Sequence, residues 1–403
     1  MKQVIVGGYN DALNNAATEY NCLMGGGTWN ATEAYVRNVL PTGGTINKMR
    51  IRLTAAPGAG TSWTFTLMKG GVASTLEVTI SDEATTGEDL AHSVSVVDGD
   101  YVSIRCTSDG GPGPATAAWS TEFNSAIAGE SLFMAVASVD NIYEEYAPTQ
   151  GRSGKNDVRV NHQNPMPCAG TLKKARVLLA QRPGAVSDVY TFTLEIGGVD
   201  KSIVVTVTDP STSGNDAVHT EAVVAGDLIN WQIVPTHDPT NQPIAAISMV
   251  FVAATDGNSV IMGGLWSSAT VNNAVRYIHL AQGATLDATE ANVYSLISSC
   301  TITDFYVLLD GAPGVGKNYK VDVRVNGAAA GQTVTIADAA TTGNDVAHTA
   351  TPTDGQTCGI EVTPTNTPTA RRVRWGLLEY NTPTGASTPK ASPASKLMTA
   401  GAL

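Results

Sequence analysis

An aspartate followed three residues later by a histidine occurs in one short phrase that this 403-residue chain contains three times. The phrase is ATTGEDLAH from Ala84 to His92, STSGNDAVH from Ser211 to His219 and ATTGNDVAH from Ala340 to His348. Carboxylate–imidazole pairs perform general acid–base chemistry, and three histidines meeting on one axis could bind a metal ion. The candidate pairs are Asp89 and His92, Asp216 and His219, and Asp345 and His348.

A structural role accounts for the same phrase. The run Thr-Thr-Gly-x-Asp is typical of a turn, in which the glycine (Gly87, Gly214 or Gly343) takes an unusual dihedral angle and the aspartate accepts bonds from nearby backbone N–H groups. The histidine would then begin the next strand. If the aspartate and the histidine shared one strand, a spacing of three would place them on opposite faces. We therefore interpret the six residues as structural, and we predict no catalytic, cofactor-binding or metal-binding residue.

The segments that precede the three phrases are also repeated. Each contains an alternating strand, a turn of two small residues and a second alternating strand, which together predict a β-hairpin with one buried face. The alternating apolar residues are Trp63, Phe65 and Leu67, then Tyr190, Phe192 and Leu194, then Tyr319, Val321 and Val323. The turns are Gly70-Gly71, Gly197-Gly198 and Asn326-Gly327. Three independent copies of this pattern make the hairpin the firmest local prediction.

The repeat extends over almost the whole chain. Each copy begins with an apolar strand (QVIVGG, SLFMAV or SVIMGG) and contains about eight short strands in roughly 125 residues. That content predicts an all-β fold of three tandem antiparallel β-sandwiches, with a jelly roll as the leading topology and another Greek-key sandwich as the alternative. The expected domains are residues 1–125, 126–255 and 256–381, arranged pseudo-threefold or in a line. Residues 382–403, rich in Pro, Ser, Thr and Ala, are expected to form an extended C-terminal arm.

The composition of the chain argues against several classes of function. A net charge of −12 with few, scattered Lys and Arg argues against nucleic-acid binding. No apolar stretch approaches the length of a membrane span, and the N-terminal segment has too short an apolar run for a signal peptide. The five cysteines show no CxxC spacing, so most are expected to be buried thiols of a protein made in a reducing cytosol.

Two further features of the sequence resemble known kinds of binding site. GAPGVGKN at 311–318 approaches a phosphate-binding loop, but it has Asn318 where Ser or Thr should bind magnesium, and it joins two strands instead of a strand and a helix. Exposed tryptophans can stack on sugars, which makes Trp29 and Trp266 candidate glycan contacts. Burial at a domain interface is the alternative for Trp29. We expect Trp63, Trp119 and Trp375 in the core.

The run from Gly43 to Thr107, with its Gly/Thr/Ala-rich strands, Pro-Gly loop and Gly-Gly turn, resembles the jelly-roll modules of tailed-bacteriophage virion proteins. Such modules occur in tail or head fibres and in decoration proteins. The resemblance extends to all three copies and implies a non-enzymatic structural role in a virion, through packing against other virion proteins and copies of itself. It implies synthesis in the host cytoplasm and no cofactor. The alternative function is a carbohydrate- or receptor-binding protein on the virion surface, with a host glycan as partner.

Overall fold

The computed structural model describes residues 2–265, 272–281 and 286–381. The regular secondary structure of this part of the chain is almost entirely β-strand, and its only helices are three short 3-10 turns, which confirms the predicted all-β sandwich class. None of these helices has the length and apolar character needed to cross a membrane. The predicted C-terminal arm at 382–403 lies outside the described residues.

The strands form three units with the same order of elements. The first unit has β1 (Lys2–Tyr9), β2 (Glu19–Asn21), η1 (Glu33–Tyr35), β3 (Asn38–Val39), β4 (Gly44–Leu53), β5 (Gly58–Lys69), β6 (Val72–Asp82), β7 (Thr86–Val96), β8 (Tyr101–Asp109) and β9 (Ala117–Ser125). The second has β10 (Glu130–Ser138), β11 (Glu145–Ala147), β12 (Gly151–Ser153), η2 (Arg159–Asn161), β13 (Asn164–Pro165), β14 (Gly170–Leu179), β15 (Val189–Ile196), β16 (Val199–Thr208), β17 (Ser213–Val223), β18 (Leu228–Thr236) and β19 (Ile244–Ala253). The third has β20 (Asn258–Gly264), β21 (Arg276–His279), η3 (Glu290–Val293), β22 (Ser295–Leu296), β23 (Thr301–Leu309), β24 (Gly314–Val325), β25 (Ala328–Asp338), β26 (Thr342–Asp345), β27 (Thr357–Thr365) and β28 (Val373–Tyr380).

Each unit is a sandwich of two sheets. In the first unit, the sheet β1-β9-β4-β7 faces the sheet β2-β8-β5-β6, and the short β3 pairs with β8. The third unit repeats this arrangement as β20-β28-β23-β26 and β21-β27-β24-β25, and the second adds only the parallel strand β12 beside β10. From β4 to β9, and in the equivalent strands of the other two units, every connection except the hairpin β5–β6 and its equivalents crosses from one sheet to the other, as in a jelly roll.

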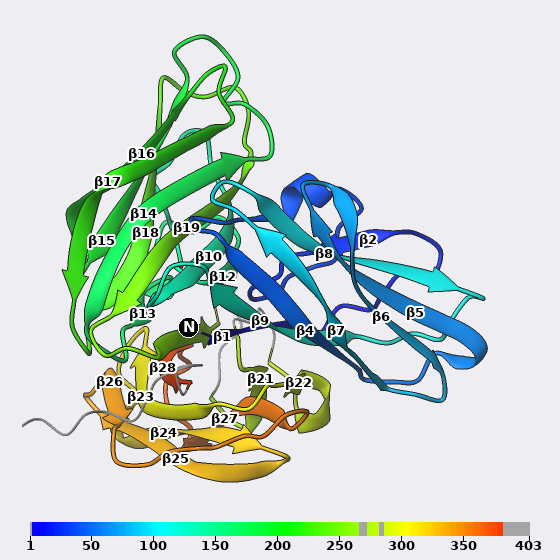
Figure 1. Cartoon of the computed structure of the whole chain (residues 1–403). Coiled ribbons are helices and arrows are strands. Elements are labelled where there is room, and N and C mark those ends of the chain that lie inside the picture. The colour runs from blue at the N-terminus through cyan, green and yellow to red at the C-terminus, as the bar shows by residue number, and fades with distance from the viewer. Residues whose placement is uncertain (1, 266–271, 282–285, 382–403) are drawn as a thin grey trace, which may run out of the picture.

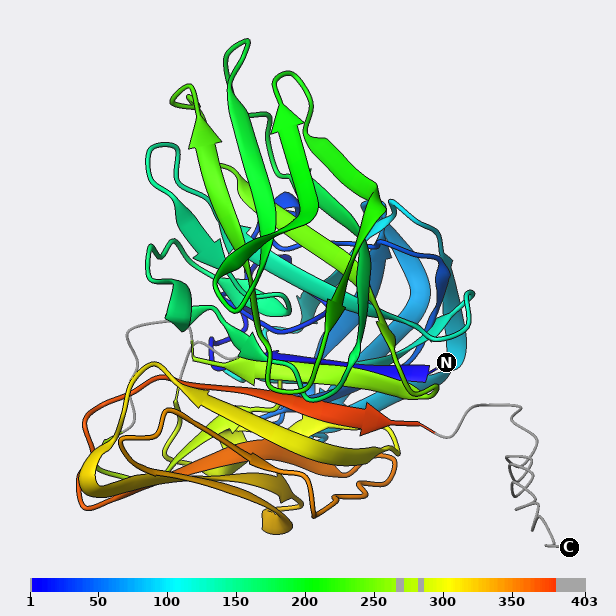
Figure 2. The same ribbon diagram turned by 90° about the vertical axis from the view of Figure 1, so that its left-hand side faces the viewer.

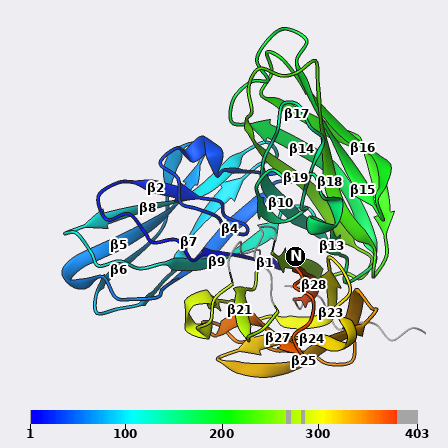
Figure 3. The ribbon, with the colours of Figure 1, turned by 180° about the vertical axis from the view of Figure 1, so that it is seen from behind.

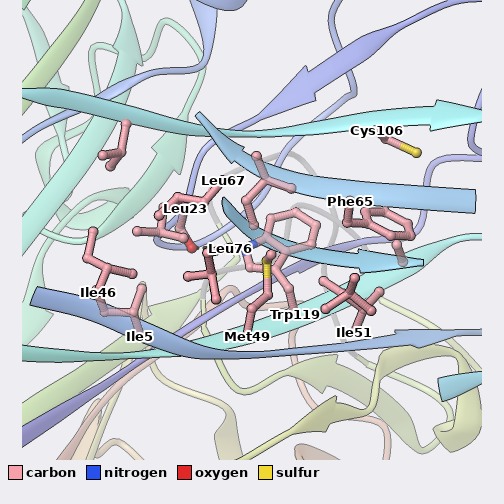
Figure 4. Packing of buried hydrophobic residues seen from close by; sticks show 14 of the residues in the cluster. Ile5, Leu23, Ile46, Met49, Ile51, Phe65, Leu67, Leu76, Cys106 and Trp119 are labelled. Atoms are coloured by element: carbon pink, nitrogen blue, oxygen red, sulfur yellow. Dashed lines mark hydrogen bonds between the residues drawn. The ribbon is translucent and has the colours of Figure 1, made fainter. Parts of the chain in front are cut away.

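The predicted hairpins are confirmed. Gly70 and Gly71 have φ of 60° and 78°, Gly197 and Gly198 have 63° and 75°, and Asn326 and Gly327 have 49° and 73°. Positive φ at both centres is what a two-residue turn needs to match the twist of its strands. The alternating residues before these turns are all buried, and in the first unit Phe65 and Leu67 pack against Trp119 and Met49 of the facing sheet (Figure 4).

The three sandwiches surround their own first strands, as the views from the front and from behind show (Figures 1 and 3). In the side view the third unit lies below the other two (Figure 2). The first strands are buried on both faces, and each gives side chains to the core of a neighbour: Val4 and Val6 to the third core, Leu132 and Met134 to the first, and Val260 and Met262 to the second. The exchange closes a ring, so the units interlock cyclically.

The predicted boundaries at 125/126 and 255/256 fall in the turns between β9 and β10 and between β19 and β20. Because the cores exchange side chains, the independence of the three domains stays a prediction that requires a folding experiment. All five cysteines are free thiols, and Cys22, Cys106 and Cys358 are buried, as expected.

Candidate functional site

The three Asp–His pairs have the same geometry in all three units. In the first unit, Asp89 Oδ1 accepts the backbone N–H groups of Ala91 and His92, both at 3.1 Å, and Asp89 Oδ2 accepts that of Glu77 on the neighbouring β6 at 3.1 Å. The ring nitrogen Nδ1 of His92 lies 2.9 Å from Asp89 Oδ2. The aspartate is buried, while 56% of the His92 side chain is exposed. The pair therefore joins two strands at the outer edge of the sandwich.

The second and third units repeat these contacts. Asp216 accepts backbone N–H groups of Val204, Val218 and His219, and Asp345 accepts those of Thr333, Ala347 and His348. The Nδ1–Oδ2 distances are 2.9 Å to His219 and 3.0 Å to His348. The recurring contacts are thus a buried carboxylate that binds backbone donors and an exposed imidazole that covers it.

Several expectations about this phrase were wrong. It does not form a turn before a strand: Gly87 to His92 lie within β7 and Gly214 to His219 lie within β17, so the histidine does not begin a strand. The aspartate and the histidine of the first two units lie in one strand, β7 or β17, and nevertheless touch. The strand bulges between them: Asp89 is opposite Met49 and Ser93 is opposite Asn47, so three residues face the single Lys48, whose φ is 52°. A bulge changes the face on which later side chains lie, so the rule of alternation fails there.

The glycine of the phrase does not take an unusual dihedral angle. None of Gly87, Gly214 and Gly343 has positive φ, and each lies in an extended strand. A Cβ atom on Gly87 would come 2.7 Å from Val78 Cγ1, and one on Gly343 would come 2.7 Å from Val334 Cγ1. Glycine is therefore needed because β6 and its equivalents cross close to this point.

The electrostatics of the pairs suit a structural role. Burial alone would raise the pKa of Asp89, but the backbone N–H donors and the His92 ring outweigh it and lower the pKa; the same holds for Asp216 and Asp345. The described residues contain no group of three or more His, Cys, Asp or Glu side chains placed to hold a metal ion. The residue whose backbone N–H binds the aspartate Oδ2 is Glu77 in the first unit but Val204 and Thr333 in the other two. An acidic side chain beside the pair is therefore not repeated in the three units.

The tryptophan candidates for glycan binding are not supported in the described part of the chain. Trp29 is only 4% exposed and packs edge-on against Trp119, with ring centroids 5.6 Å apart. Trp266 lies outside the described residues. Trp63, Trp119 and Trp375 are buried as expected, and so is Trp231. The segment at 311–318 joins β23 to β24, so it lacks the strand-to-helix context of a phosphate loop.

Sequence reasoning missed the polar contacts at the centre of the molecule. Side chains of one unit bind the backbone of the next unit's first strand, in cyclic order. Gln3 of the first unit exchanges two bonds with the backbone of Leu132, at 2.8 and 2.9 Å. Gln150 of the second unit binds Val260 O at 3.0 Å and Met262 N at 2.9 Å. These amides satisfy backbone groups that a buried sheet edge would otherwise leave unpaired.

The third unit closes the cycle with a carboxylate and an amide. Glu379 accepts the N–H of Val4 at 3.0 Å and the hydroxyl of Ser259 at 2.8 Å, and Asn381 Nδ2 binds Lys2 O at 3.0 Å. By strand register, Glu379 occupies the place that Phe123 and Phe251 have in the other two units. Its complete burial raises the pKa of Glu379 to about 7, although its hydrogen-bond donors lower it in part.

Equivalent arginines join the units further out. Arg50 of the first unit is buried and lies 3.4 Å from Asp354 and 2.6 Å from Ser298 of the third. Arg176 of the second unit binds Asp98 of the first, with Nη2 2.6 Å from Oδ2. At the third junction, Tyr306 approaches Gly226 instead. Arg50 and Arg176 therefore serve contacts between units. No family model matches this chain, and no curated protein matches it significantly.

Proposed function

We propose that this protein is a non-enzymatic structural component of a bacteriophage virion, acting through protein–protein packing as a decoration protein or as part of a fibre or tail. The observation that carries the proposal is the closed ring of three sandwiches that exchange core side chains. One chain thereby forms a block with approximate threefold character, which suits insertion at or around a symmetry axis of a larger assembly.

The use of the ionisable residues supports the same role. The Asp–His pairs bind backbone N–H groups, and the buried Arg50 binds a neighbouring unit. The resemblance to phage jelly-roll modules is an analogy of fold and style, and a fold alone does not determine function. The carbohydrate-binding alternative loses its tryptophan basis at Trp29, because that ring is buried.

The test is localisation on particles together with native mass. Antibodies against the purified chain, detected by immunogold electron microscopy, should label phage particles from the source culture at regular positions on the head or the tail. Native mass spectrometry should show assembly of the chain with itself or with other particle proteins. A chain that stays monomeric and labels no particle would contradict the proposal.

The predicted arm offers a second test of the same role. Removing residues 382–403 should weaken incorporation into particles while the far-ultraviolet circular dichroism spectrum stays that of a folded β protein. Equal incorporation of the truncated and full-length chains would refute a role of the arm in assembly.

A further inference from the structure

A polar cleft of about 870 Å³ opens where the first unit meets the third. One wall is the outer face of β4 and β9, with Asn47, Lys48, Glu122 and Asn124, and the opposite wall includes Tyr380 at the end of β28. Its volume falls in the range of small-molecule sites, and it lies at a junction between structural units, where such sites are common.

The cleft presents hydrogen-bond donors and acceptors side by side. Glu122 is 2% exposed and lies 3.2 Å from the ammonium group of Lys48 and 3.6 Å from that of Lys2. Asn124 Nδ2 donates to Asn47 Oδ1 at 3.4 Å. Among the described residues, no further partner binds these two amides, so Asn47 Nδ2 remains available as a donor and Asn124 Oδ1 as an acceptor.

An aromatic ring borders the same polar groups. Tyr380 is 37% exposed and makes no hydrogen bond with its hydroxyl among the described residues. A partly exposed tyrosine offers a flat apolar face that an apolar ring face of a ligand can cover, together with a hydroxyl group that can still bind water or ligand.

The fold does not require this polarity. By strand register, Val250 and Val252 of the second unit occupy the places of Glu122 and Asn124, and Glu130 occupies the place of Lys2. There Glu130 is closed off directly: Lys173 and Lys174 lie 3.0 and 2.8 Å away, and Thr42 of the first unit donates to it. At the junction of the second unit with the first, direct contacts thus fill the equivalent place. At the junction of the first unit with the third, polar groups face an open cleft instead.

We propose that this cleft binds a neutral oligosaccharide. Sugars present hydroxyl groups that both donate and accept, and an apolar ring face suited to Tyr380. An anionic ligand fits less well, because the Glu122 carboxylate lies at the cleft and the ammonium groups of Lys48 and Lys2 already lie within 3.6 Å of it. An apolar ligand would leave the free amide groups of Asn47 and Asn124 without partners. The proposal adds a ligand to the structural role and does not depend on it.

The experiment is a glycan array of neutral and acidic oligosaccharides probed with the full chain, followed by calorimetry with the strongest neutral binder. Tyr380→Ala and Asn124→Ala should each weaken binding about tenfold, as expected for the loss of one stacking or hydrogen-bonding contact. Tyr143→Ala is the matched control, because Tyr143 is a 67% exposed tyrosine that does not line the cleft, and it should bind like the wild type.

Three outcomes would overturn the proposal. They are the absence of any binder on the array, binding confined to acidic glycans, and binding that Tyr380→Ala and Asn124→Ala leave unchanged. Circular dichroism of each variant separates loss of the site from loss of the fold. Labelling of particles is independent of these binding measurements. A chain that binds no glycan could still be a structural virion component, and a chain that labels no particle could still bind a glycan in this cleft.

Discussion

Glu379→Gln should remove a pH dependence of stability that the buried carboxylate creates at the centre of the molecule. In the folded chain the pKa of Glu379 is raised to about 7, against 4.5 for the ordinary side chain. The folded state therefore holds a proton that the unfolded state releases earlier. Stability linked to this group is fully present below pH 4.5, falls as the pH rises towards 7, and is constant above that.

The magnitude follows from about 1.4 kcal/mol for each unit of pKa difference. Between pH 5 and pH 8, ionisation of Glu379 should cost the wild type about 2.5 kcal/mol of folding free energy, a cost that glutamine does not bear. The free energy of unfolding of both proteins should be measured by urea denaturation at pH 5, 6, 7 and 8, with tryptophan fluorescence as the signal. The informative quantity is the difference between the two proteins, because other titrating groups, such as Glu145, cancel in it. Parallel curves across this range would refute the assignment of a raised pKa to Glu379.

The other predictions concern stability and folding. Asp216→Ala should lower the free energy of unfolding by about 2–4 kcal/mol, because three backbone N–H groups lose their acceptor. His219→Ala should lower it by under about 1 kcal/mol, because that ring is largely exposed. Equal effects of the two substitutions in denaturant titrations would contradict this. Trp29→Ala should cost about 3–5 kcal/mol through the cavity it leaves, measured in the same way, and a loss below about 1 kcal/mol would show that the ring is not in the core. The free energy of unfolding of a fragment of residues 1–127 should be about 3–5 kcal/mol lower than that of the same unit in the whole chain. The fragment lacks Leu132 and Met134 in its core and exposes Val4 and Val6. An equally stable fragment would show that the units fold independently.

The hairpins could be predicted because their signals are local. Alternation of Trp63, Phe65 and Leu67 and the glycine pair that follows specify strand, turn and buried face within a few residues. The repeat then multiplied the same signal by three. The Asp–His contact could not be predicted in this way, because the bulge that produces it depends on Lys48 in a strand far away in the sequence.

Burial of Trp29 and the exchange of core residues are also tertiary effects. A signal for the exchange was present, however. The segments QVIVGG, SLFMAV and SVIMGG are continuously apolar and do not alternate, which is typical of strands covered on both faces. The candidate cleft could not be predicted from sequence patterns, because its walls come from units that lie about 250 residues apart along the chain.

The side chains that bind the first strands at the centre of the molecule, Gln3, Gln150 and Glu379, are not identical in the three units, and this difference bears on how the sequence can vary there. In a trimer of identical subunits, any substitution near the axis appears three times at once, so a single ionisable group there is impossible. Covalent linkage removes that restraint: one position carries Glu379, while its counterparts keep Phe123 and Phe251. Joining the copies into one polypeptide thus allows a dissimilar centre inside a nearly symmetric frame, where each junction can acquire a property of its own.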